Sequence, residues 1–215
     1  MLPRITVAAL LALLAAGCDP DWDDGGWGYD VSDHFPLDGS ERVWVYDSLD
    51  ESVEWTLLVE KTTVVHEGDL DVVTLEHSND DTLTVLAQVD WSSDSTGGVR
   101  IHGYHVEDGD VSVAFDPPIQ FAELEMTPGD AVETETGGTT FTSTFETVEG
   151  CGTFWAPSWD DEGCLKFTLA DGDEDPATNA YIAGSYWLVT RYGPAWLVLD
   201  AYPARWSLSD RFWEE

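Results

Sequence analysis

Basic side chains are scarce in this sequence. Its 215 residues include 8 Lys and Arg against 43 Asp and Glu, which gives a formal net charge of −35 at pH 7. Phosphate binding needs clustered Lys and Arg, so this balance excludes nucleic acid as a direct partner. It also argues against a surface that lies flat on anionic lipid. The hydrophobic share of 43% still allows a folded core.

The sequence also lacks the short motifs of common catalytic sites. It contains no G-x-S-x-G nucleophile elbow, no H-E-x-x-H motif, no P-loop and no dinucleotide fingerprint. Among 43 acids some must lie near each other, so a carboxylate pair carries no information about glycoside hydrolysis. We therefore predict a protein that is not an enzyme, with no catalytic residue, no metal site and no cofactor.

One pair of histidines, His102 and His105, has a spacing that merits a test as a metal site. Residues three apart on a strand point to opposite faces, so both contact one ion only if the strand bulges, for instance at Gly103. We favour the interpretation that these are surface or packed histidines.

No hydrophobic run is long enough for a membrane-spanning helix. The longest, Ile5–Ala16, has 12 residues and follows Arg4, whereas a span needs about 20. It ends in Leu14-Ala15-Ala16-Gly17-Cys18, which resembles a bacterial lipobox. We predict that residues 1–17 are a lipoprotein signal peptide and that acyl chains on Cys18 anchor the protein in the bacterial cell envelope. The motif does not decide whether the anchor lies in the outer membrane or on the periplasmic face of the inner membrane.

Residues 18–34 form an acidic stretch that predicts a flexible tether. Asp19, Asp21 and Asp23 alternate like the first half of a calcium loop, and Asp171, Asp173 and Asp175 repeat the pattern. Neither segment has the Gly that such a loop requires next. Solvated charge is the favoured interpretation, and weak calcium binding is the alternative.

From residue 35 to residue 215 the dominant period is two. Val111, Val113 and Phe115 alternate with polar residues, and turn sequences such as Asp108-Gly109 separate the alternating runs. This pattern predicts a single all-β domain: a strongly curved antiparallel sheet of roughly eight to eleven strands, as a half-barrel or a closed barrel. Asp116-Pro117-Pro118 predicts either a break in the sheet or a sheet edge. The fully apolar run 195–199 predicts a central strand covered on both faces.

Two cysteines remain once Cys18 is assigned to lipid. Cys151 and Cys164 lie thirteen apart, and an exported protein favours a disulfide between them. The enclosed loop contains Trp155 and Trp159 beside acidic residues, an arrangement that suits a sugar or an apolar ligand.

Three short motifs resemble a group of uncharacterised, β-rich bacterial lipoproteins. Their mature domains open on an F-P-L-x-x-G-x-x-W-x-Y-like motif. The corresponding residues here are Phe35-Pro36-Leu37-Asp38-Gly39 with Trp44-Val45-Tyr46, then Glu146-Thr147-Val148, Gly152-Thr153-Phe154 and Cys164-Leu165-Lys166-Phe167, and finally Tyr181, Gly184, Leu188 and Val189. The resemblance implies a lipoprotein with a β-rich fold and carries no chemistry with it.

These observations favour a non-enzymatic, lipid-anchored envelope protein. We expect its curved sheet to bind an apolar ligand or a partner protein. One alternative is a carbohydrate-binding module that uses exposed Trp155 and Trp159. Another is a purely structural surface protein, whose acidity serves solubility in salty surroundings.

Overall fold

The computed structural model describes residues 28–35, 37, 42–50, 52–53, 56–67, 70–79, 81–82, 84–151, 163–172 and 179–213. Cys18, Trp155 and Trp159 lie outside these residues, as does the acidic segment 19–23. Within the described part, no helix is long and apolar enough to cross a membrane.

The described residues form fourteen strands and one short 3-10 helix. In chain order the elements are β1 (Tyr29–Asp30), η1 (Val31–His34), β2 (Arg42–Ser48), β3 (Leu57–Glu67), β4 (Leu70–Asn79), β5 (Thr84–Asp94), β6 (Gly98–Val106), β7 (Val111–Ala122), β8 (Glu125–Met126), β9 (Ala131–Thr136), β10 (Thr139–Glu149), β11 (Cys164–Asp171), β12 (Gly184–Val189), β13 (Gly193–Leu199) and β14 (Tyr202–Trp213).

Alternating burial explains why these segments are strands. On β5, Ala87, Val89 and Trp91 are buried, while the residues between them are half-buried. A strand such as β5 therefore places one apolar face toward the interior. The hairpin predicted at Asp108-Gly109 joins β6 to β7, with positive φ angles of 91° at Gly109 and 51° at Asp110.

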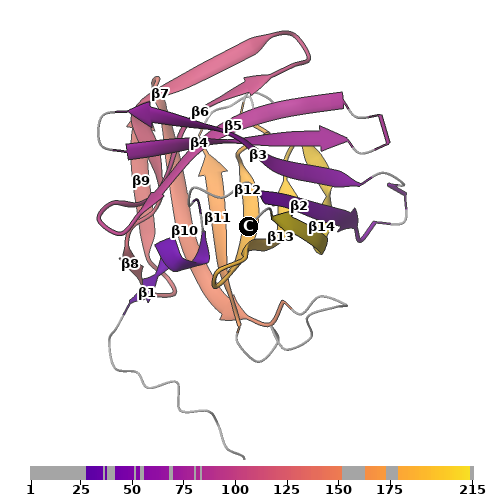
Figure 1. Cartoon of the computed structure of the whole chain (residues 1–215). Coiled ribbons are helices and arrows are strands. Elements are labelled where there is room, and N and C mark those ends of the chain that lie inside the picture. Colours follow the sequence, from indigo (N-terminus) through magenta and orange to yellow (C-terminus); the bar gives the residue numbers. More distant parts are fainter. Residues whose placement is uncertain are drawn as a thin grey trace, which may run out of the picture.

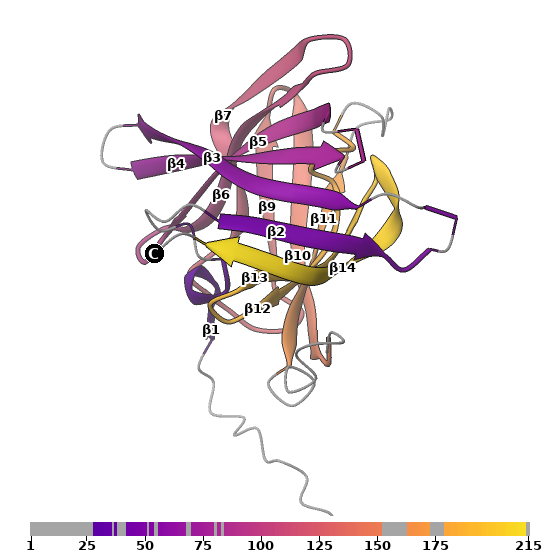
Figure 2. The same cartoon turned by 45° about the vertical axis from the view of Figure 1, so that its right-hand side comes forward.

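Twelve strands form one antiparallel sheet in the order β7-β6-β5-β4-β3-β2-β14-β13-β12-β11-β10-β9. The sheet curves around its interior until the edge strands β7 and β9 pack together, which gives a nearly closed barrel (Figures 1 and 2). At this seam the Gln120 backbone N–H donates to Thr134 Oγ1 at 3.0 Å. The all-β, strongly curved fold is confirmed, and the Pro117-Pro118 strand β7 is an edge strand.

Two details differ from the sequence-based expectation. The main sheet has twelve strands rather than eight to eleven, because strands such as Ala-Val-Glu-Thr-Glu-Thr (β9) carry almost no apolar alternation. The folded body also begins before residue 35. Within the segment assigned to a tether, Tyr29 and Asp30 pair with β8, and Val31 is buried in the core.

Aromatic rings fill the part of the barrel enclosed by β7, β10 and β11. Phe145 stacks on Phe167 at a ring distance of 4.8 Å, and Phe121 lies 5.4 Å from Phe167. Phe115 and Phe141 meet edge to face at 5.4 Å. This side of the interior is therefore solidly packed.

The apolar run 195–199 forms most of β13, which lies inside the sheet between β12 and β14. Its outward-facing Trp196 packs edge to face on Trp187 at 5.9 Å. The Arg205 guanidinium lies 5.1 Å from the Trp196 ring, within cation–π range. This contact explains how the outer face of β13 can also be apolar.

Cys151 and Cys164 are brought together where the β10–β11 hairpin opens. Both are buried, and their Cα atoms are 5.8 Å apart, a separation that a disulfide spans. The predicted pairing is confirmed. It closes the loop that contains Trp155 and Trp159.

We predict that replacing Cys151 and Cys164 together with Ala lowers the free energy of unfolding. A bridge across a sequence separation of 13 restricts the unfolded chain by about 3 kcal/mol in the chain-entropy model. Urea denaturation followed by tryptophan fluorescence measures the change. The oxidised and dithiothreitol-reduced wild type provide the control, and equal midpoints for all three proteins would contradict the prediction.

Candidate functional site

An apolar pocket lies in the barrel interior beside the phenylalanine cluster, since its lining residues Trp91 and Tyr186 contact Phe121. It spans about 480 Å³ of space that no atom fills, open solvent at its mouth included. Strands β2, β3, β4, β5, β12 and β13 form its walls. The lining residues are Phe35, Leu37, Trp44, Tyr46, Val59, His77, Val89, Trp91, Tyr181, Tyr186, Gly193, Pro194, Leu197 and Leu199.

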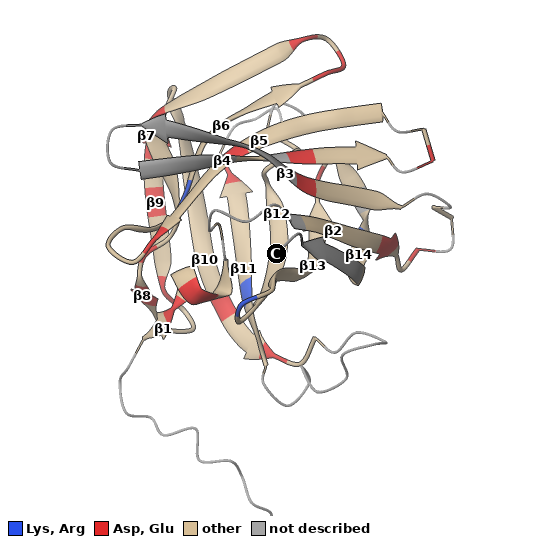
Figure 3. Cartoon of the chain, viewed as in Figure 1, with Lys and Arg blue, Asp and Glu red and all other residues tan. Residues whose placement is uncertain are grey.

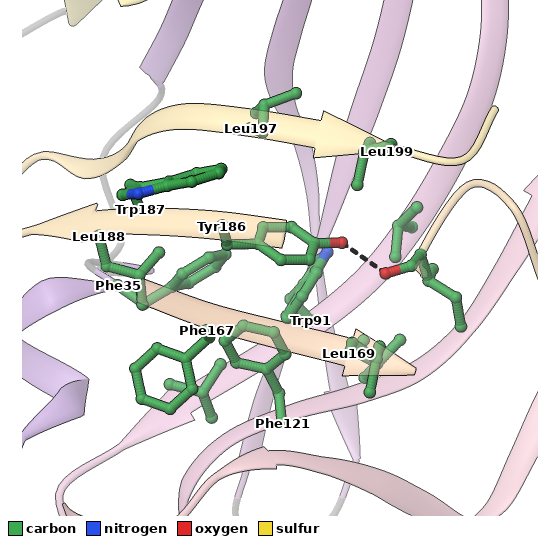
Figure 4. Packing of buried hydrophobic residues seen from close by; sticks show 14 of the residues in the cluster. Phe35, Trp91, Phe121, Phe167, Leu169, Tyr186, Trp187, Leu188, Leu197 and Leu199 are labelled. Atoms are coloured by element: carbon green, nitrogen blue, oxygen red, sulfur yellow. Dashed lines mark hydrogen bonds between the residues drawn. The ribbon is translucent and has the colours of Figure 1, made fainter. Parts of the chain in front are cut away.

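The two-residue period of the strands explains this lining. Trp44 and Tyr46 alternate with outward residues on β2, as Val89 and Trp91 do on β5. Phe35 follows η1 and closes one end of the pocket, where its ring stacks on Trp91 at 4.8 Å. Figure 4 shows Phe35, Trp91 and Phe121 gathered beside Tyr186 of β12.

Three aromatic residues of the lining pair their polar atoms with backbone carbonyls. Trp44 Nε1 donates to Tyr192 O at 2.8 Å, and the Tyr46 hydroxyl donates to Pro194 O at 2.8 Å. The Tyr186 hydroxyl donates to Ile182 O at 2.7 Å. Burial raises the pKa of both tyrosines, which keeps them uncharged. These rings therefore present apolar faces to the pocket.

Among the described residues that line the pocket there is no Asp, Glu, Lys or Arg. Figure 3 shows acidic positions at turns and along strands, and Glu133 and Glu135 on β9 are exposed. The high negative charge of the chain is thus kept away from the interior. The pocket chemistry is that of an uncharged, apolar surface.

His77 on β4 is the one histidine in the lining. Its side chain is only 6% exposed, and its Nδ1 lies 3.5 Å from the Tyr202 hydroxyl. Burial removes the ring from water and lowers the pKa of His77 from 6.5 to about 4. The imidazole is therefore neutral at physiological pH and contributes a hydrogen-bonding group without a charge.

The buried His77 predicts that stability falls as the pH is lowered from 7 to 4. In this range the unfolded chain binds a proton at this histidine and the folded chain does not, so protons favour unfolding. For a pKa shift of this size, the full loss in the free energy of unfolding is about 3 kcal/mol. The measurement is the urea midpoint of wild type and His77→Gln at each pH.

The His77→Gln variant should lose less stability than wild type between these pH values. His34 is the matched control. Burial also lowers the pKa of His34, so its protonation at low pH favours unfolding as that of His77 does. A His34→Gln variant should keep the His77 contribution. Identical pH profiles for wild type and His77→Gln would refute the assignment.

The structure describes only some of the site residues that the sequence predicts. Cys151 and Cys164 lie together, whereas Cys18, Trp155 and Trp159 lie outside the described residues. The structure adds a site that sequence reasoning did not locate. One signal for it was present, because the four apolar or aromatic residues of the opening motif, Phe35, Leu37, Trp44 and Tyr46, all line the pocket.

The two histidines considered as a metal pair have separate partners. A bulge near Gly103 leaves both half-buried, but His102 Nε2 lies 2.8 Å from Ser92 Oγ, and His105 Nδ1 lies 2.8 Å from Ser112 Oγ. Across the described part of the chain, no group of three or more His, Cys, Asp or Glu side chains could hold a metal ion.

Comparisons of the chain with protein-family models, with curated proteins and with solved structures find no match. The resemblance to β-rich lipoproteins therefore remains a prediction that depends on the motifs alone. The functional argument depends on the pocket.

Proposed function

We propose that this protein is a lipid-anchored, non-enzymatic binding protein of the bacterial cell envelope that holds a small apolar molecule inside its barrel. The observation that carries the proposal is the pocket itself. Eleven of its fourteen lining residues are buried, while Leu37, Tyr181 and Pro194 are half-buried. Predominantly apolar, aromatic pockets of this kind are the usual sites for small ligands.

Removing an apolar ligand from water supplies the binding energy at such a site. Burial of apolar area contributes roughly 25 cal/mol per Å². The polar atoms of Trp44, Tyr46 and Tyr186 need no ligand, because each already has the backbone partner described above. A ligand therefore does not have to replace those hydrogen bonds, and its affinity follows its apolar surface.

The envelope location in this proposal depends on Cys18. A body with a net charge of −35 gains nothing from contact with anionic lipid, so its attachment would come from acyl chains. One chain holds a protein only weakly, and two or more hold it firmly. Lipidation would thus keep the pocket at a membrane while the acidic body remains in water.

We predict that Val59→Phe reduces binding of N-phenyl-1-naphthylamine, a neutral probe that fluoresces in apolar sites. Val59 lines the pocket from β3, so a larger side chain fills space that the ligand needs. Affinity should fall about tenfold, equivalent to about 1.4 kcal/mol. The probe is titrated into the chain carrying Cys18→Ser, which needs no detergent because it has no acyl chains.

Leu58→Phe is the matched control, because Leu58 is the neighbouring residue on β3 and faces away from the pocket. It should leave probe affinity unchanged. Val89→Phe gives a second obstruction if Val59→Phe does not fold by circular dichroism. Absence of probe binding by the folded parent would refute the proposed function.

We predict that Cys18→Ser abolishes anchoring. In a bacterial host, the wild-type chain should enter the detergent phase of a Triton X-114 extraction, and the variant should remain in the aqueous phase because it has no acyl chains. Cys151→Ala with Cys164→Ala is the control that keeps the anchor. Equal partition of wild type and Cys18→Ser would contradict lipidation.

A further inference from the structure

The described lining of the pocket offers no counter-charge for an ionised ligand. None of the lining residues that the structure describes is acidic or basic. The described basic side chains are engaged elsewhere: Lys166 and Arg205 lie over the Trp187 ring, and Arg100 pairs with Asp94 at 3.3 Å. Arg191 is exposed at a turn. A carboxylate or phosphate in the pocket would therefore be buried without a partner.

Burial of an unpaired ion is costly in such a site. Even a single unpaired polar group loses several-fold to several-hundred-fold in affinity when it leaves water, and an ion loses more. The net charge of −35 adds repulsion for any anion that approaches the protein. A cation would be attracted to the outer surface but would find no carboxylate among the lining residues. The occupant that fits is uncharged.

His77 gives this apolar wall one polar feature. Its Nδ1 contact to the Tyr202 hydroxyl, at 3.5 Å, is at the long limit of a hydrogen bond. Among the described residues, its Nε2 has no hydrogen-bond partner, and the ring lines the pocket. A neutral imidazole carries one donor and one acceptor nitrogen, and its tautomer decides which nitrogen donates.

A hydroxyl group matches either tautomer, because it can donate to a bare ring nitrogen or accept from a protonated one. A ketone or an ester only accepts, so it suits one tautomer alone. The position of His77 on β4 therefore selects for a hydroxyl at one end of an otherwise apolar molecule.

We propose that the pocket takes an uncharged apolar molecule with a single hydroxyl group, which hydrogen-bonds to the His77 imidazole. This inference rests on the proposed function, because it names the class of ligand for the same pocket. It excludes ionised fatty acids, although their chains are equally apolar.

The test is displacement of bound N-phenyl-1-naphthylamine from the full chain carrying Cys18→Ser, at pH 7.5. The competitors are 1-octanol, octyl methyl ether and octanoate, which each contain an unbranched chain of eight carbon atoms, the carboxylate carbon of octanoate included. We expect 1-octanol to displace the probe at the lowest concentration, with octanoate weaker by tenfold or more.

Substitution of His77 separates its hydrogen bond from general apolar binding. His77→Leu should weaken 1-octanol about fivefold, the usual effect of one lost hydrogen bond, and should weaken octyl methyl ether, whose oxygen only accepts, by less. His77→Gln keeps a donor and an acceptor and should restore part of the preference. Ser78→Ala, at the adjacent outward position on β4, is the matched control and should change neither ligand.

The outcomes distinguish the two proposals. If the probe binds but octanoate competes as well as 1-octanol, the inference about ligand class is wrong while the apolar pocket stands. The inference is equally wrong if His77→Leu leaves the preference for 1-octanol intact. If neither the probe nor 1-octanol binds the folded chain, the proposed function itself fails.

Discussion

Enclosure of one apolar face by a single curved sheet is the constraint on which the rest of this structure depends. Every long strand contributes inward residues at alternate positions, and a flat sheet would leave that face in water. Curving the sheet until β7 meets β9 buries most of this face, and Val31 of η1 and Phe35 add to the same core. The Gln120–Thr134 hydrogen bond lies at the seam where this closure is completed.

The pocket follows from an uneven distribution of side-chain volume around that interior. Strands β7, β10 and β11 supply phenylalanines, which meet ring to ring. Strands β3, β5 and β13 supply smaller residues such as Val59, Val89 and Gly193. Since close-packed interiors rarely leave space next to small residues by chance, the cavity is a specific feature of this half of the barrel.

The distribution of charge supports the same functional picture. Acidic residues occur at turns and along the strands, and none is among the described residues that line the pocket. The surface favours water over anionic lipid, whereas the interior favours a neutral apolar molecule. An acyl anchor on Cys18 would reconcile these properties, because it brings an acidic body to a membrane without direct contact between its surface and lipid.

The sequence by itself determined the all-β class, the hairpin at Asp108-Gly109, the edge position of the Pro117-Pro118 strand and the Cys151–Cys164 pairing. These follow from local chemistry: side-chain period, turn residues, proline and cysteine. The sequence could not reveal strands with polar inward faces, such as β9. Such strands are defined by their pairing with neighbouring strands and not by an apolar period of their own.

Only the tertiary structure decided where the pocket lies. Trp44 and Tyr192, whose hydrogen bond closes one wall, are 148 residues apart in the chain. The antiparallel pairing of β14 with β2 brings the C-terminal strands beside the opening motif. Alternation shows that Trp44, His77 and Leu197 are each on an inward face. Which inward faces oppose each other depends on how twelve strands close around one interior, and no local pattern contains that information.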